Sequence, residues 1–278
     1  MLSARRKFGS VLGIAILIGA TVGVAAPASS TVVTDCTYND MVGLVTVDIS
    51  ANGSATVDRD GDFIEVNNVT CSDGVTAATV LNTEVINIIG DTGNESAEVS
   101  LYTGRLAPGR TDEVGESDEI EIFVNLLEGT DDSLEISGSD SRDRIVAGTS
   151  GGQTRVNLNA LEGDTVDYDL SVNDNVEQFN IYGHDKSDTI AATGGFDTGT
   201  VLQREIGISG MSGNDMLTGG AGSDVLSDKA GPGDTDVLNG KGGNDSLFTR
   251  DRDGLDRALG RPGDDVCSVN PRDIARGC

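Results

Sequence analysis

The sequence has 278 residues and carries 46 acidic side chains against 19 Lys and Arg, which gives a formal charge of −27. So strong a negative charge makes nucleic acids and anionic membrane surfaces poor partners. Only 4% of the residues are aromatic and 38 are glycine, so a thick core of large side chains is not expected. This composition favours a thin all-β fold of β-branched side chains and tight turns, whose excess acidity calls for a divalent cation.

Residues 1–28 are predicted to be a secretory signal peptide. Three basic residues at positions 5–7 precede an uncharged apolar run over residues 11–26, and Ala26-Pro27-Ala28 offers a small-residue cleavage site. The apolar run is shorter than the roughly 20 residues that a membrane span requires. We therefore expect a secreted, extracellular chain without a membrane span after cleavage. An uncleaved anchor is the alternative.

The four cysteines lie in two groups near the ends of the predicted mature chain. Export permits disulfides, and proximity in sequence favours pairing within each group, although four cysteines allow three connectivities. Free thiols are the alternative. The favoured pairs are Cys36 with Cys71 and Cys267 with Cys278.

Residues 29–182 are predicted to be a β-rich region of short strands separated by turns. Short alternating apolar runs bounded by Gly, Asp or Asn indicate the strands, and no window shows a convincing helical period. The favoured arrangement is a degenerate parallel β-helix, and a multi-stranded sandwich is the alternative for residues 31–130. The predicted strands lie at residues 45–47, 63–66, 85–89, 120–124 and 134–136.

Tandem nine-residue repeats are predicted over residues 183–249. Residues 219–227, GGAGSDVLS, fit the pattern G-G-x-G-x-D-x-U-x at every position, where U is a large apolar residue. The segment before it, GMSGNDMLT, and two segments after it, GPGDTDVLN from Gly231 and GKGGNDSLF from Gly240, keep the aspartate and the apolar residue. The aspartates at the sixth position of these four repeats are Asp215, Asp224, Asp236 and Asp245.

This pattern resembles the RTX, or haemolysin-type, calcium-binding repeat of secreted bacterial proteins. The resemblance covers residues 183–268 and is weaker over residues 60–182. It implies a β-roll in which six residues of each repeat turn, three form a strand, and each ion lies between turns two repeats apart. The ligands that it implies are Asp215 with Asp236 on one side, Asp224 with Asp245 on the other, and the carbonyl groups of Gly213, Gly220, Gly222 and Gly243. It also implies an inward stack of Leu217, Leu226, Leu238 and Leu247.

Calcium suits these residue types. Glycines let a turn adopt left-handed angles and bring carbonyl oxygens close together, and Ca²⁺ takes about six to eight oxygen ligands. Turn chemistry alone does not require an aspartate at a fixed position with an apolar residue two later. Two departures weaken the pattern. Asp234 replaces the fourth glycine after an insertion at residues 228–230, which puts the Asp215/Asp236 geometry in doubt, and the upstream repeats around Asp143 and Asp188 lack the glycines.

Residues 250–278 are predicted to form a C-terminal cap, pinned by the Cys267/Cys278 pair. This segment has six Arg against six Asp, unlike the acidic region before it. The end of a repeat stack needs an atypical segment that hides its last apolar layer. A ligand-binding end, or residual calcium-binding turns at Asp256 and Asp265, are the alternatives.

Other residue patterns are interpreted as structural. His184 is the only histidine and is predicted to be an exposed turn residue, since a zinc site would need further His or Cys ligands. Residues 58–62 lack the glycine and glutamate of an EF-hand loop and are predicted to form a turn. No catalytic signature is present.

We therefore expect a non-catalytic, calcium-stabilised extracellular module. Its expected partners are calcium ions and a cell-surface or matrix polysaccharide or protein. The alternative is a carbohydrate-active enzyme or toxin-related protein built on a β-helix.

Overall fold

The computed structural model describes residues 34–50, 52–111, 119–159, 168–228 and 233–278. These residues all belong to the unit formed by residues 31–278. The predicted signal peptide, residues 1–28, lies outside them. Strands and turns, without a helix, make up the described residues, so the prediction of an all-β fold is confirmed. It follows that no described segment is an apolar helix of membrane-spanning length.

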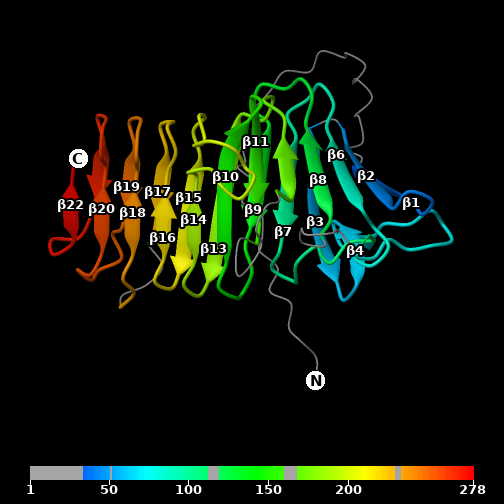
Figure 1. The fold of residues 1–278 in the computed structure, drawn as a ribbon, viewed down its shortest axis with the longest axis horizontal. Coiled ribbons are helices and arrows are strands. Elements are labelled where there is room, and N and C mark those ends of the chain that lie inside the picture. The colour runs from blue at the N-terminus through cyan, green and yellow to red at the C-terminus, as the bar shows by residue number, and fades with distance from the viewer. Residues whose placement is uncertain (1–33, 51, 112–118, 160–167, 229–232) are drawn as a thin grey trace, which may run out of the picture. The chain divides into compact units, whose positions relative to one another are not determined.

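The described strands form two sheets in which most neighbours are parallel (Figure 1). The first sheet has 12 strands, in the spatial order β1 (Thr34–Asn39), β2 (Leu44–Ile49), β6 (Val85–Ile89), β8 (Glu121–Asn125), β12 (Leu170–Val172), β11 (Gln153–Asn157), β10 (Arg144–Ser150), β14 (Thr189–Ala191), β16 (Met216–Thr218), β18 (Val237–Asn239), β20 (Arg257–Leu259) and β22 (Ile274–Arg276). The second sheet has ten, in the order β21 (Val266–Ser268), β19 (Ser246–Phe248), β17 (Val225–Ser227), β15 (Gly207–Ser212), β13 (Gln178–Asp185), β9 (Ser133–Ser137), β7 (Ser96–Ser100), β3 (Ser54–Asp60), β4 (Phe63–Val66) and β5 (Val69–Thr70).

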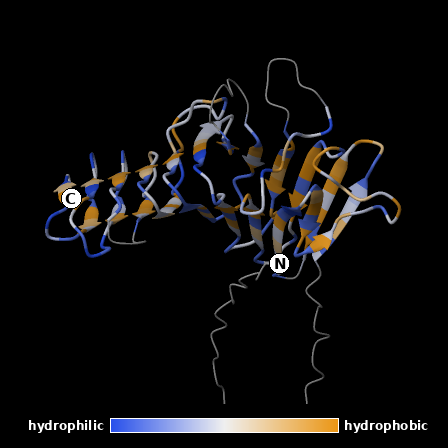
Figure 2. Ribbon diagram, turned by 90° about the horizontal axis from the view of Figure 1, so that it is seen from below, coloured by the Kyte–Doolittle hydropathy of each residue, from blue (hydrophilic) through white to orange (hydrophobic). Residues whose placement is uncertain are grey.

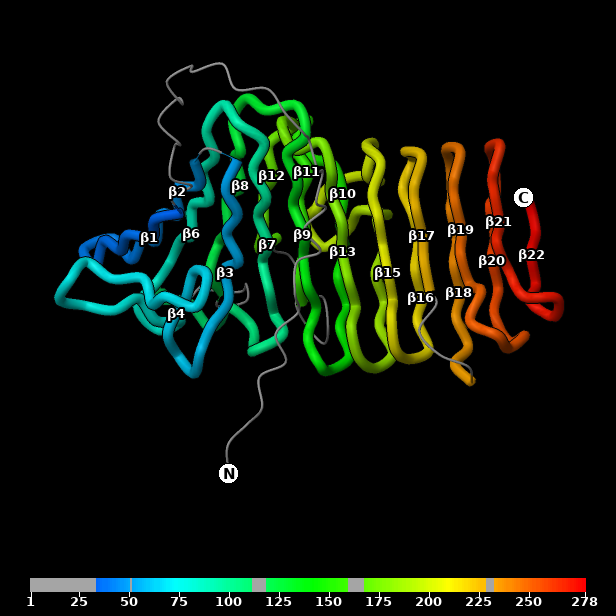
Figure 3. Tube along the Cα trace, turned by 180° about the vertical axis from the view of Figure 1, so that it is seen from behind, coloured from blue at the N-terminus to red at the C-terminus, as the bar shows by residue number. Residues whose placement is uncertain are grey.

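From β13 onward, consecutive strands alternate between the two sheets. Each strand therefore pairs in parallel with the strand two further along the chain, and the tube in Figure 3 can be followed through these layers from green to red. Leu217 in β16 aligns with Leu238 in β18, and Leu226 in β17 aligns with Leu247 in β19. The leucines of alternate repeats thus share one register.

The same alternation extends upstream to β2, with hairpins added to it. The pairs β2–β6, β6–β8, β3–β7 and β7–β9 are all parallel, so the predicted strands of residues 29–182 join the same two sheets. The antiparallel exceptions are β1 with β2, the set β3–β4–β5 and the set β10–β11–β12. The turn predicted at residues 58–62 is shorter than expected, because residues 58–60 pair with β4 and belong to β3.

The core between the sheets is narrow over the repeats. Figure 2 shows hydrophobic colour on the strands and hydrophilic colour on many of the connecting turns. Each three-residue strand from β16 to β19 buries only its central leucine. Burying one leucine contributes about 1.5–3 kcal/mol, whereas ordering each residue costs about 1–2 kcal/mol. Interactions within the turns must therefore stabilise this part of the fold.

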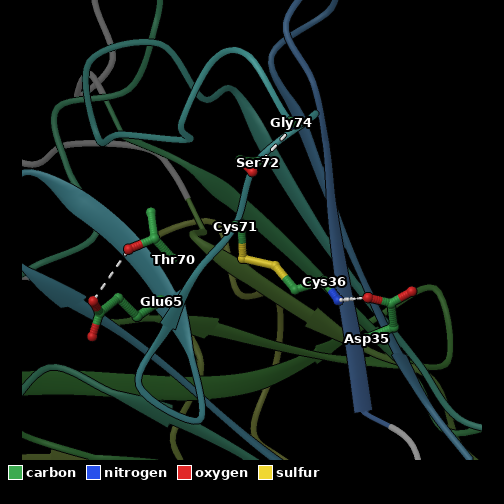
Figure 4. The surroundings of a disulfide bond; sticks show 7 residues. All are labelled: Asp35, Cys36, Glu65, Thr70, Cys71, Ser72 and Gly74. Atoms are coloured by element: carbon green, nitrogen blue, oxygen red, sulfur yellow. Dashed lines mark hydrogen bonds between the residues drawn. A yellow bond between two sulfur atoms is a disulfide. The ribbon is translucent and has the colours of Figure 1, made fainter.

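Two disulfides join the pairs that proximity favoured. Cys36 in β1 bonds to Cys71, which directly follows β5, so this bond connects the first sheet to the end of the second (Figure 4). Cys267 in β21 bonds to Cys278 at the C-terminus. Disulfides persist in oxidising compartments, so both bonds indicate an extracellular environment.

Candidate metal centre

The sixth-position aspartates of the four repeats are buried at the ends of the turns. Asp215, Asp224, Asp236 and Asp245 directly precede β16, β17, β18 and β19, and none is more than 3% exposed. An aspartate is rarely buried to this extent without a partner for its charge. The positions of these side chains therefore call for a partner group or ion.

One ladder of backbone-to-carboxylate hydrogen bonds follows the turns that lead into the first sheet. The N–H of Asp143 donates to Oδ1 of Asp188 at 2.7 Å, and the N–H of Asp188 donates to Oδ1 of Asp215 at 2.7 Å. The N–H of Asp215 donates to Oδ1 of Asp236, and that of Asp236 donates to Oδ1 of Asp256, both at 2.9 Å. The first ladder therefore places Asp215 and Asp236 side by side despite the insertion between them.

A second ladder follows the turns that lead into the second sheet. The N–H of Asp224 donates to Oδ1 of Asp245 at 2.9 Å, and the N–H of Asp245 donates to Oδ1 of Asp265 at 2.8 Å. Upstream, Glu95 donates its N–H to Oδ1 of Asp132 in the same manner. The structure thus places Asp224 beside Asp245, and ion binding by the pair stays a prediction.

The other carboxylate oxygen of several ladder residues faces no donor. Oδ2 of Asp188, Asp215 and Asp245 is buried and has no hydrogen-bond partner among the described residues. Leaving a buried charge uncompensated costs several kcal/mol. These oxygens are therefore positioned to hold a proton or to contact a cation.

The glycines of the repeats allow the turns and the carboxylates to approach closely. A side chain on Gly240 would collide with the carboxylate of Asp245, and one on Gly219 would collide with that of Asp224. Gly243 has a φ of +113°, and a Cβ at this position would overlap the carbonyl oxygen of Gly222.

The remaining predicted glycine ligands make similar contacts between turns. A Cβ on Gly213 would overlap the carbonyl oxygen of Lys186. The carbonyl oxygen of Gly220 accepts a hydrogen bond from the N–H of Gly242 at 3.2 Å. Close packing of successive turns is therefore one reason for glycine at these positions.

Asp228 joins the Asp215/Asp236 pair, although the repeat pattern assigns it to an insertion. Asp215, Asp228 and Asp236 are buried, and each offers an oxygen within 4.8 Å of the others. The N–H of Asp228 donates to the carbonyl of Phe248, in the way that first-position Gly219 donates to Asn239. Asp228 therefore takes the first position of its turn. Its place directly after the strand Val225–Ser227 is the sequence signal that could have identified it.

Burial raises the pKa values of the ladder carboxylates. Desolvation raises the pKa of Asp188 to about 8 and the pKa values of Asp224 and Asp236 to about 7. Neighbouring carboxylates raise them further, while hydrogen bonds from backbone N–H groups lower them. Without a cation, these carboxyl groups are therefore partly protonated near neutral pH.

The donor set consists of oxygens, which suits hard divalent cations rather than zinc or copper. His184 does not contribute to this cluster. The prediction that it is an exposed turn residue is wrong, because it pairs within β13, is half-buried, and lies with its ring centroid 5.6 Å from that of Tyr102.

The chain matches no protein-family model, and it shows no significant similarity to a curated protein or to a solved structure. Its function is therefore inferred from its own residues and their geometry.

Proposed function

We propose that this chain is an extracellular, non-catalytic, calcium-binding β-solenoid protein that resembles the RTX repeat proteins and is stabilised by its ions. The observation that carries the proposal is the set of buried carboxylate oxygens without a hydrogen-bond partner at Asp188, Asp215 and Asp245. They occur at turns where glycine leaves room for the carboxylate.

The binding of a cation is supported in particular by the cluster of Asp215, Asp228 and Asp236. Three carboxylates within 4.8 Å of one another repel unless they share protons or bind a positive charge. Calcium tolerates irregular sites built from carboxylate and carbonyl oxygens, whereas Mg²⁺ demands near-octahedral geometry. Asp224 with Asp245 forms the corresponding site on the second ladder, together with carbonyls of the neighbouring turns.

Ion binding would supply stability that the narrow core does not. A site that forms only in the folded state turns its binding energy into folding energy. Extracellular calcium modules bind at roughly 10⁻⁴–10⁻³ M, so these sites would load outside the cell. In this proposal the two sheets wind as a β-roll, residues 250–278 close its end, and the acidic surface keeps the module soluble beside a polysaccharide or protein partner.

Calorimetric titration of the disulfide-intact full chain with calcium tests the proposal. We expect saturable binding, and a gain of about 2.7 kcal/mol in unfolding free energy at a calcium concentration 100 times the Kd. Asp224→Asn with Asp245→Asn should reduce the number of ions bound, while Asp140→Asn, at an exposed position, should not. Absence of binding heat together with an unchanged melting temperature would overturn the proposal.

A further inference from the structure

A second group of carboxylates lies outside the nine-residue repeats, in the segment predicted to be a cap. Asp251, Asp253 and Asp256 each offer an oxygen within 4.8 Å of the others. They lie within six residues of sequence, D-R-D-G-L-D, in the turn between β19 and β20. This turn begins with Thr249 rather than glycine. The repeat pattern offers only Asp256 as an alternative ligand here, and it does not predict a role for Asp251 or Asp253.

One oxygen of each buried carboxylate is fixed by hydrogen bonds. Oδ1 of Asp251 accepts from the N–H of Asp253 at 3.0 Å and from Nδ2 of Asn270 at 2.7 Å. Oδ1 of Asp256 accepts from the N–H of Asp236 at 2.9 Å. These bonds orient both carboxylates even when no ion is bound.

The other oxygens of the same two side chains have no partner. Oδ2 of Asp251 and Oδ2 of Asp256 are buried without a hydrogen-bond partner among the described residues, and the two residues are 8% and 1% exposed. Two such oxygens in one small cluster, with a third carboxylate from Asp253 beside them, make a binding place for positive charge.

Asp253 supplies the more accessible side of the group. It is partly exposed, and its two oxygens accept from the N–H groups of Gly233 at 2.6 Å and Leu255 at 3.0 Å. Carboxylate oxygens have further lone pairs, so these bonds leave Asp253 able to contact an ion. Asp253 is therefore the ligand of the group that solvent reaches most readily.

We propose that Asp251, Asp253 and Asp256 form a divalent-cation site that fastens the turn at residues 249–256 to the last turn of the chain. Asn270 connects the site to that last turn through Asp251. Asp273 strengthens the connection, because its Oδ2 accepts from Oγ1 of Thr249 at 2.9 Å and from the N–H of Asn270 at 2.6 Å. Oxygen-only ligands favour calcium, magnesium or manganese, and calcium is the ion used to test the site.

The three carboxylates of this site come from one turn and are not among the ligands proposed for the repeats, although Asp256 also accepts the ladder bond from Asp236. Substitution of Asp251 and Asp253 therefore leaves the ladder bond in place. Equilibrium dialysis of the full chain against radioactive calcium counts the ions. We expect Asp251→Asn with Asp253→Asn to bind about one ion fewer than the wild type. Asp264→Asn, an exposed residue of the following turn, is the matched control and should bind the wild-type number.

Trypsin digestion provides a second measurement, because Arg252 is exposed and lies between the ligands Asp251 and Asp253 in the sequence. Calcium at ten times its Kd should slow cleavage after Arg252 by about tenfold in the wild type and in Asp264→Asn, since cleavage follows the population of the open state. In the double variant, Asp251→Asn with Asp253→Asn, calcium should not change the rate of this cleavage. If the double variant does not fold, Asp253→Asn alone, at the more exposed ligand, gives the same comparison.

An unchanged ion count with unchanged calcium protection in the double variant would overturn this site. A different result would separate the two proposals. If the Asp251/Asp253 variant loses one ion while variants of Asp224/Asp245 and Asp215/Asp236 lose none, the proposed repeat sites are overturned and the site in this turn is supported. A wild-type chain that binds no calcium would overturn both.

Discussion

The backbone N–H of Asp224 donates a 2.9 Å hydrogen bond to Oδ1 of Asp245, which lies 21 residues further along the chain. One carboxylate oxygen thus joins two turns, while Oδ2 of Asp245 is buried without a partner. Asp245 therefore has two separable tasks: its Oδ1 holds the two turns together, and its Oδ2 is available to an ion.

This separation predicts different outcomes for two substitutions of Asp245. Asn keeps the Oδ1 acceptor and removes the buried charge, so Asp245→Asn should be as stable as the wild type in chelator, or more stable. Asp245→Ala leaves the N–H of Asp224 unsatisfied and should lose about 1–3 kcal/mol. Urea unfolding in chelator checks the order, and an Ala variant more stable than the Asn variant would contradict it.

Two glycines of one turn provide a matched pair. A Cβ on Gly240 would overlap the Asp245 carboxylate, whereas a Cβ on Gly242 meets no atom within 4 Å. Gly240→Ala should therefore unfold about 1–3 kcal/mol more easily and bind calcium more weakly. Gly242→Ala should be neutral or stabilising by up to about 1 kcal/mol. Denaturant titration and calcium calorimetry distinguish them, and equal effects would contradict this prediction.

In the presence of a chelator, the free energy of unfolding should decrease as the pH rises from about 4 to 8. The pKa values of Asp224 and Asp236 are raised to about 7 and that of Asp188 to about 8, mainly by burial. The pKa of an aspartate in the unfolded chain is about 3.9. The folded state therefore binds more protons in this range, so its stability is greatest below the unfolded pKa and is lost as pH rises through the folded values.

Melting temperatures measured from pH 4.5 to 8 check the direction. Saturating calcium should flatten the pH dependence, because the ion replaces the protons. A melting temperature in chelator that increases steadily over this range would contradict the assignment.

The two disulfides should differ in their contribution to stability. The Cys36–Cys71 bond closes a separation of 35 residues and the Cys267–Cys278 bond one of 11. Loop-closure entropy predicts losses of about 4 and about 3 kcal/mol when each pair is changed to serine. Urea unfolding of the two double-serine variants tests the order, and the reverse order would show that other terms dominate.

The repeat sequences predicted the register of the C-terminal strands because each nine-residue unit carries one inward leucine. Leu217 and Leu226 have the partners expected from the spacing. The β10–β11–β12 hairpins were not predicted, because alternation of apolar residues does not tell whether the chain crosses to the other sheet or turns back.

The candidate site was predicted less completely than the strands. The repeat pattern assigns Asp228 to an insertion. Its position in the turn is fixed by the hydrogen bond from its N–H to the carbonyl of Phe248, which the sequence does not reveal. The ladder could not be predicted either, because a spacing does not say which carboxylate oxygen a backbone N–H will reach.

Both ladders have a direction. In each bond named above the upstream residue provides the N–H and the downstream residue provides the carboxylate, as for Asp188 with Asp215 and Asp236 with Asp256. The backbone bonds between the same turns run the other way, since the N–H of Val237 donates to the carbonyl of Asp215 and that of Ser246 to the carbonyl of Asp224. Each turn therefore completes the one before it and is completed by it, so we expect neighbouring turns to form and unfold together.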